Sequence, residues 1–290
     1  MLSSPTKLMN ELRFDNFRGD FFGGLTAAIV ALPLALAFGV ASGIGPSAGL
    51  YGAISVGFFA ALFGGTPAQI SGPTGPMTVV MASTVAAFAA STSESGLAMV
   101  LTVVMLGGLF QILLGLLRLG KYITLIPYTV ISGFMSGVGV IIIVLQIGPL
   151  LGHEGTAGVV NSIAAIPTYL SAINPAAAGL GLLTLVIVFA APARLNRILP
   201  APLIALIVCT LLSVLGLPNS EIPHIGDIPG GLPTLHPPQF EWQNLKDMLV
   251  YGIMLGTLGA LDSLLTSLVA DNVTRTQHNS DRELIGQGIG

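Results

Sequence analysis

Asp262 is the only ionisable side chain within the long apolar stretches of this sequence. A charged group at mid-membrane costs at least about 2.5–3.5 kcal/mol, so such a residue faces a cavity or a partner. Thr266 follows four residues later and shares the same helix face. A carboxylate and a hydroxyl are hard oxygen ligands, which suit Na⁺ or H⁺. We therefore predict a cation site at Asp262 and Thr266. The alternative is a protonated Asp262 that hydrogen-bonds a neighbouring helix.

A second candidate site is the proline-punctuated run Ser71–Pro76, which precedes an apolar helix. Prolines fix φ and push the preceding residue toward extended geometry, so the chain before Pro73 is predicted to be irregular. Thr74 is predicted to cap the helix that begins near Gly75. Free N–H groups and the positive dipole end of a helix attract anions. We predict an anion site at Thr74 and Gly75, with an ordinary turn as the alternative.

The run Ala31–Gly39 contains Pro33 in the middle of an apolar stretch. A proline there predicts a kink or break. The small residues around it let another helix end or a ligand approach closely. A kinked helix that only packs against its neighbours is an equally good interpretation.

The elements that must position these residues are apolar and long. Hydrophobic residues make up 53% of the 290 residues and charged residues 8%, with a mean hydropathy of +0.87, whereas soluble domains carry about 25% charged residues. A helix of about 20 apolar residues crosses a membrane. The sequence therefore predicts an all-α membrane protein with about eight transmembrane helices, near residues 21–43, 47–64, 73–91, 97–117, 124–151, 176–192, 200–217 and 248–270. A short interfacial helix is predicted at 158–172 and the longest extramembrane loop at 218–245.

The basic residues are distributed unevenly across this topology. With eight crossings both termini share one side, and nine of the ten Lys and Arg residues fall on that side, all except Lys246. Basic loops stay in the cytoplasm. We therefore predict a multi-pass protein of the cell inner (plasma) membrane with both termini cytoplasmic, including the segment 1–20.

Several function classes are disfavoured by composition. The net charge of −3 argues against nucleic-acid binding. The single Cys209 excludes an internal disulfide framework. A lone intramembrane Asp without a Ser–His pair argues against an intramembrane enzyme. The charged cluster near the C-terminal end is interpreted as a solvated cytoplasmic face: Arg275, His278, Asp281, Arg282 and Glu283.

Six runs taken together are recognisable, and they cover about residues 14–290. They are 18–27, 31–33, 71–74, 127–134, 259–265 and 279–288. In these runs the chain resembles the SulP family of anion transporters, and it looks closest to the sodium-dependent bicarbonate transporters within that family.

The resemblance implies the N-terminal part of a 7+7 inverted-repeat fold of the SulP/UraA-like kind, with a core and a gate domain. In that fold, half-helices three and ten meet around the anion. Thr74 and Gly75 would then lie by the anion, and Asp262 and Thr266 would hold the coupling Na⁺. The anion pocket would be walled by Pro33, Leu34 and Phe38.

Two departures from the family pattern are visible. The family often has Gln after the first-helix proline, where this chain has Leu34, and this leaves the choice of anion more open. The chain also stops at Gly290, where helix nine is expected. Residues 21–290 are therefore expected to be an incomplete transmembrane domain that lacks helices 9–14 and the STAS domain, and that transports nothing alone.

The function implied is secondary transport of a small inorganic anion, most simply sodium-coupled bicarbonate uptake by an elevator-like sliding of the core domain. A homodimer is expected for the complete protein. Proton-coupled transport of sulfate or a dicarboxylate by the same fold is the main alternative. A non-transporting assembly subunit stays open for the chain as given.

Overall fold

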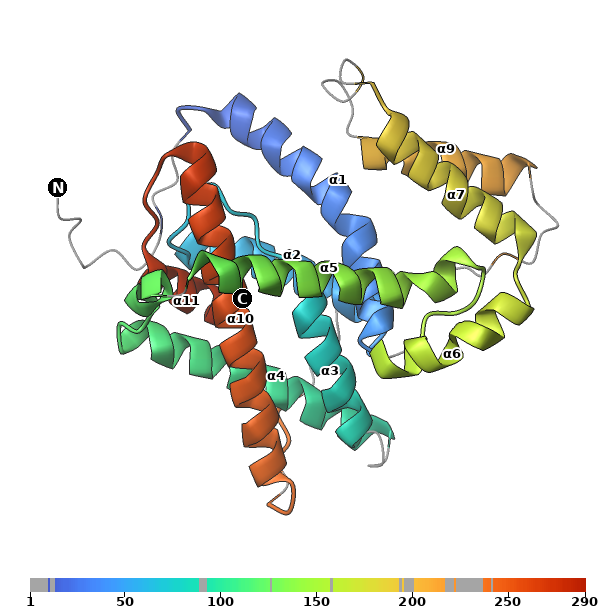
Figure 1. Cartoon of the computed structure of the whole chain (residues 1–290). Helices are drawn as coiled ribbons and strands as arrows, with labels where there is room; N and C mark the ends of the chain where they lie inside the picture. The colour runs from blue at the N-terminus through green and yellow to red at the C-terminus, as the bar shows by residue number, and fades with distance from the viewer. Residues whose placement is uncertain are drawn as a thin grey trace.

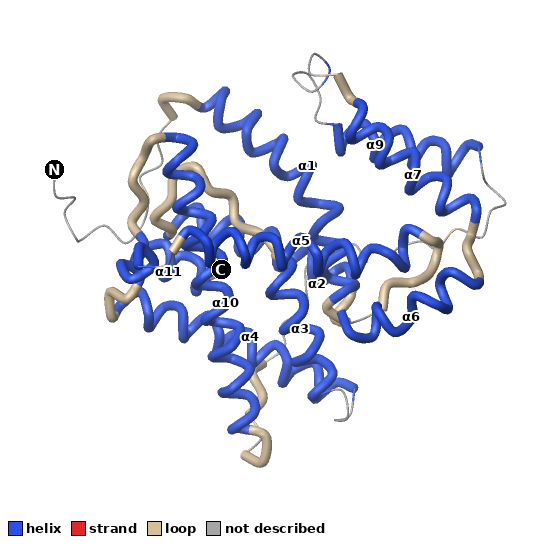
Figure 2. The backbone as a smooth tube through the Cα atoms, viewed as in Figure 1, coloured by secondary structure: helices blue, strands red, loops and turns tan. Residues whose placement is uncertain are grey.

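In the computed structural model all regular secondary structure of the described residues is helical, and no strand occurs among them (Figure 2). The described residues are 10, 14–88, 93–125, 127–156, 159–192, 195, 201–216, 222, 237–240 and 242–290. Most of the predicted loop 218–245 lies outside them.

Each of the eight predicted apolar stretches contains a helix. The elements are α1 (Phe17–Ala41), α2 (Pro46–Phe63), α3 (Gly75–Phe88), α4 (Ser93–Leu116), η1 (Gly120–Leu125), α5 (Tyr128–Leu150), α6 (Val159–Ser171), α7 (Pro175–Ala190), α9 (Ala201–Leu211), η2 (Leu212–Gly216), α10 (Leu245–Thr274) and α11 (Ser280–Ile289). The predicted all-α architecture is confirmed, and the predicted segment 158–172 is the helix α6.

Helix length separates full membrane crossings from shorter segments. Four described spans are long and apolar enough to cross a membrane alone: α1, α2, Gly96–Leu116 of α4, and α10. A fifth is obtained if α6 and α7, which meet at a 116° bend, are counted as one broken span. The helix α3, with 14 residues, is too short to cross alone.

The helices form two groups, with α1 and α5 between them (Figure 1). The first group contains α2, α3, α4, α10 and α11, and the second contains α6, α7 and α9. In the first group α4 is central, because both α10 and α11 pack against it, and α11 also packs against α2. The helix α3 contacts α4 and α10. In the second group α7 packs against α9, and α6 packs against α5. The first group carries both predicted ion sites.

A buried apolar cluster fixes α3 against α4 and α10. Within a membrane, van der Waals packing rather than water exclusion holds such helices together. The cluster places α3 and α10 side by side, which is the arrangement that the candidate site requires. Its buried members are Val80, Phe88, Met99, Val100, Val103, Met248 and Leu255.

The helix α1 runs without a break through Pro33. Of the predicted kink or break, the break is therefore wrong, and the kink stays a prediction. A proline removes one backbone hydrogen bond, and membrane helices tolerate that loss because neighbouring groups can compensate.

Glycines allow α11 to approach α2 and α4 closely. A Cβ placed on Gly286 would lie 2.4 Å from the backbone N of Gly64, and one on Gly288 would lie 2.4 Å from the carbonyl O of Gly108. Such separations are far below van der Waals contact. The backbone of α11 therefore rests directly on the end of α2 and on α4.

We predict that Gly286→Ala lowers the free energy of unfolding by about 1–3 kcal/mol, because the methyl group overpacks the α2–α11 contact. Thermal unfolding of the purified protein measures this loss. Gly23→Ala on α1 is the matched control, because its Cβ meets nothing within 4 Å and it gains the same helix propensity. Equal stability of the two variants would contradict the close approach.

Candidate functional site

The start of α3 supplies helix-terminal donors inside the first group of helices. Residues 69–74 have no regular secondary structure, and α3 begins at Gly75. The Thr78 N–H donates to the carbonyl O of Thr74 at 3.0 Å, which closes the first turn. Pro76 carries no N–H, so the unpaired donors of this terminus are those of Gly75 and Met77. Two N–H groups and the dipole of α3 thus form an anion-attracting end.

The Thr74 hydroxyl does not cap α3. Its Oγ1 is buried and makes no hydrogen bond of good geometry within the described residues. It lies within interaction distance of the Asp262 carboxylate. The predicted capping role is therefore wrong, and the hydroxyl instead lies between the start of α3 and the acid of α10. A buried hydroxyl without a partner is costly unless a ligand satisfies it.

Asp262 is half-buried on α10. Thr266 lies one turn further along, and its hydroxyl donates to the main-chain carbonyl of Asp262 at 2.9 Å. The Thr266 side chain is exposed in the described chain. A cation at Asp262 would meet the carboxylate and the Thr74 hydroxyl, which are both oxygen donors. The role of Thr266 as a cation ligand stays a prediction.

The predicted wall of the anion pocket comes from α1, which packs against α3. Phe38 is 6% exposed and Leu34 is 47% exposed. Pro33 is half-buried. The placement of α1 agrees with a pocket beside α3, but the roles of these three side chains stay predictions.

The predicted solvated face at the C-terminal end is wrong for Glu283, which is 2% exposed. Its carboxylate accepts hydrogen bonds from the Gly65 N–H at 2.9 Å and from the Ser263 hydroxyl at 3.2 Å. The Gln287 amide donates a third bond at 2.9 Å. Asp281 is also engaged, because it accepts from the Gly120 N–H at 3.0 Å. Sequence reasoning missed Glu283 because α11 was interpreted as polar surface.

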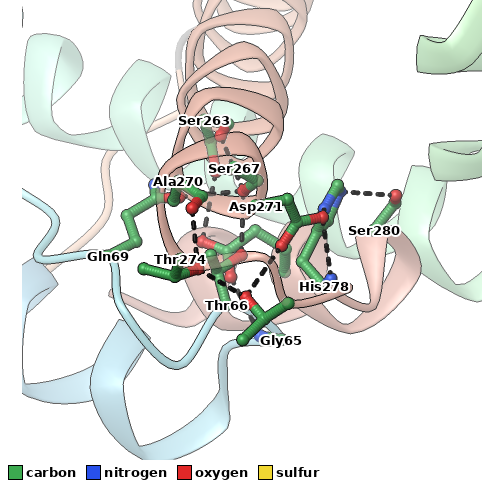
Figure 3. A network of polar contacts seen from close by, with 12 residues as sticks. Gly65, Thr66, Gln69, Ser263, Ser267, Ala270, Asp271, Thr274, His278 and Ser280 are labelled. Carbon is green, nitrogen blue, oxygen red and sulfur yellow. Dashed lines mark hydrogen bonds and ion pairs between the residues drawn. The ribbon is translucent and has the colours of Figure 1, made fainter.

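His278 is the second residue of that face that is not solvated, because its side chain is only 5% exposed. Its Nδ1 lies 2.6 Å from Oδ2 of Asp271, and its Nε2 lies 2.8 Å from the Ser280 hydroxyl (Figure 3). The Asp271 carboxylate also accepts from the His278 N–H at 3.0 Å. This cluster closes the turn between α10 and α11. It fixes the position of α11 relative to the helix that carries Asp262.

A concave feature lies at α7, away from the residues of the predicted ion sites. A concavity of about 400 Å³ is lined by residues of α7 and η2, such as Leu180, Leu183 and Leu212. Its walls are apolar. It therefore does not correspond to either predicted ion site. Among the described residues, no group of three or more His, Cys, Asp or Glu side chains is arranged to hold a metal ion.

The sequence profile of the Sulfate permease family matches residues 17–290, which is most of the chain. The chain belongs to the sulfate permease family. This family is the one called SulP above, so the predicted resemblance is confirmed.

Two relatives are named as transporters of bicarbonate. The bicarbonate transporter BicA of Picosynechococcus sp. is 52% identical over 98% of this chain and 51% of its own length. BicA of Synechocystis sp. is 52% identical over 98% of this chain and 50% of its own length. The chain thus spans about half the length of these relatives. They are named as transporters and not as enzymes, in agreement with the prediction from composition.

Two solved structures of similar fold support the same assignment. The transmembrane domain of a cyanobacterial bicarbonate transporter BicA matches with a TM-score of 0.87 and 51% identity, over 98% of this chain and 72% of that chain. The structure of SLC26A9 matches with a TM-score of 0.77 and 20% identity, over 96% of this chain and 47% of that chain, which shows the shared fold. The chain is therefore a multi-pass membrane protein with the SulP/UraA fold.

We predict that Thr74→Val leaves the free energy of unfolding unchanged or slightly higher, because the Thr74 hydroxyl makes no hydrogen bond that valine would lose. Ser267→Ala is the contrasting variant, because the Ser267 hydroxyl lies 2.8 Å from Oε1 of Gln69. Loss of the Ser267 hydroxyl is expected to lower the free energy of unfolding by about 1 kcal/mol. Thermal unfolding of both variants decides this. A Thr74→Val loss as large as that of Ser267→Ala would show that the Thr74 hydroxyl is structural.

Proposed function

We propose that this chain serves secondary active transport of a small inorganic anion, namely sodium-coupled uptake of bicarbonate. The observation that supports it best is the position of the Asp262 carboxylate beside the Thr74 hydroxyl at the start of α3. A negative side chain and a positive helix end lie next to each other within apolar helices. Each attracts an ion of opposite sign.

The proposed coupling follows from electrostatics. An anion at the α3 terminus would be repelled by an ionised Asp262 alone. A Na⁺ bound at Asp262 cancels that repulsion and adds attraction. Each ion therefore raises the affinity for the other, and the effect is reciprocal by thermodynamic linkage. The two ions would then bind and move together.

The choice of bicarbonate rests on the relatives. The BicA relatives are 52% identical to the chain. A third relative, YvdB of Bacillus subtilis, is named as a putative sulfate transporter. It is 32% identical over 94% of this chain and 51% of its own length. Because the chain covers about half of these proteins, the transport cycle, its elevator-like sliding and a homodimeric assembly are proposals for the complete transporter.

The proposed orientation places both termini in the cytoplasm, with the protein in the cell inner membrane. Its support is the uneven distribution of Lys and Arg, nine of ten of which fall on one side of the predicted topology. In this orientation the turn between α10 and α11 faces the cytoplasm. Coupling to the sodium gradient would then drive bicarbonate inward.

We predict that Asp262→Asn in the natural full-length protein abolishes sodium-dependent uptake of labelled bicarbonate, because the neutral amide no longer attracts Na⁺. Uptake is measured in cells at varied sodium, with the amount of membrane-inserted protein determined in parallel. Asp247→Asn is the matched control, since Asp247 is exposed in the first turn of the same helix. Sodium-dependent uptake that survives in Asp262→Asn would remove the proposed cation role.

We predict that Thr74→Val raises the apparent KM for the transported anion by about 10- to 150-fold, because a hydrogen bond to a charged group contributes about 1.5–3 kcal/mol. Uptake is measured with bicarbonate and with sulfate, each at saturating sodium. The control is Thr84→Val, whose hydroxyl donates within α3 to the carbonyl of Val80 at 2.8 Å. An unchanged KM in Thr74→Val would count against an anion at this helix end. Sulfate uptake without sodium dependence would favour the proton-coupled alternative.

A further inference from the structure

The carboxylate of Glu283 joins the two segments that form the candidate site. Its Oε1 accepts from Ser263, the residue that follows Asp262 on α10, at 3.2 Å. Its Oε2 accepts from the backbone N–H of Gly65, which lies in the non-helical segment 64–74 between α2 and α3, at 2.9 Å. A carboxylate only accepts hydrogen bonds, so both partners act as donors. One buried side chain therefore holds α10 and the approach to α3 together.

Gln287 extends this connection toward Thr74. Its Nε2 donates to Oε1 of Glu283 at 2.9 Å and also to the hydroxyl of Ser71. Only Gly72 and Pro73 separate Ser71 from Thr74. The hydrogen-bonded path thus begins beside Asp262 and ends just before the start of α3.

The part of α11 that carries Glu283 is itself fixed against the end of α2. The Asn279 N–H donates to the carbonyl of Gly65 at 3.0 Å. The Arg282 Nε donates to the carbonyl of Phe63 at 3.2 Å. The Asn279 side chain caps α11 by accepting from the Arg282 N–H at 3.1 Å. The Glu283 backbone therefore offers a rigid base for its carboxylate.

A second set of contacts ties the irregular segment to α10 one turn beyond Ser263. The Ser267 hydroxyl lies 2.8 Å from Oε1 of Gln69 and 2.8 Å from the hydroxyl of Thr66 (Figure 3). Residues 69–74 have no regular secondary structure. Backbone without a helix or sheet ladder depends on side chains to satisfy and place its polar groups. The position of the α3 start relative to α10 thus depends on these contacts.

We propose that Glu283 is a positioning residue, which sets the separation between Asp262 and the α3 terminus and thereby the strength of coupling between the two ions. The inference rests on the proposed function. Coulomb attraction between two bound ions depends on their separation. A looser connection weakens the mutual effect of the ions even when each site persists. Glu283 touches neither ion.

The test compares Glu283→Gln with Asp281→Asn in the natural full-length protein. Both change a carboxylate of α11 to an amide of the same shape, but Asp281 accepts from Gly120 in η1 and lies off the path. In Glu283→Gln an amide NH₂ replaces one acceptor oxygen. This NH₂ then faces a group that donated to the carboxylate, so at least one hydrogen bond of the path is lost. The readout is the ratio of the KM for the anion at low sodium to its KM at saturating sodium. This ratio does not depend on how much folded protein is present.

For the unmodified protein and for Asp281→Asn we expect a ratio of about 5–150, the range of typical coupling factors. For Glu283→Gln we expect a ratio that falls toward one. Ser71→Ala removes only the last contact of the path, so it is expected to lower the ratio less, and it replaces Glu283→Gln if that variant fails to insert. The proposal would be overturned if the KM ratio of Glu283→Gln, or of Ser71→Ala in its place, equals that of the unmodified protein.

Hydrogen exchange of the peptide covering residues 64–74 gives a readout that needs no transport. Glu283→Gln is expected to speed exchange there and Asp281→Asn to leave it unchanged. If the unmodified protein takes up sulfate rather than bicarbonate, the cargo proposal is wrong and the ratio is measured with sulfate. If it takes up neither anion, the proposed function is wrong. Unchanged exchange in Glu283→Gln contradicts the present inference in every one of these cases.

Discussion

The arrangement on which the rest of this structure depends is an acid placed beside a helix N-terminus within apolar surroundings. Asp262 is half-buried on α10, and the Thr74 hydroxyl at the start of α3 lies within reach of its carboxylate. Charge at membrane depth is costly, and it persists where it faces a partner or an ion. The helix terminus supplies the opposite polarity. The Thr74 hydroxyl forms no hydrogen bond of good geometry among the described residues, so it is free to bind an ion.

Maintaining this arrangement requires support from outside α3 and α10. The helix α3 begins after an irregular segment, and irregular backbone at membrane depth is tolerated only where protein or a cavity surrounds it. Here α11 provides that support through Glu283 and Gln287, and its glycines let it rest on α2 and α4. Packing, hydrogen bonding and charge placement thus act on the same few residues. The side chains of Glu283 and Gln287 hydrogen-bond the polar groups of the irregular segment, and the close helix contacts of α11 hold these two side chains in place.

The sequence predicted the helices well, because they depend on local patterns, whereas the ion-binding roles of Asp262 and Thr74 stay predictions. Apolar stretches of membrane length became helices, and Asp262 and Thr74 were selected from cost and turn chemistry alone. The unbroken helix at Pro33 could not be predicted, since compensation for the lost hydrogen bond comes from the surroundings. The burial of Glu283 was also missed, because its partners Gly65 and Ser263 are distant in sequence. The one local signal was Gly286 and Gly288, small residues typical of a closely packed face.

The central claim is that the two ions bind side by side and strengthen each other. Equilibrium binding to the purified unmodified full-length protein tests it most directly, with the Na⁺ affinity measured with and without bicarbonate and the bicarbonate affinity measured with and without Na⁺. The account predicts that each ion raises the affinity for the other by the same factor, on the order of 5–150. Affinities that do not respond to the other ion would contradict it.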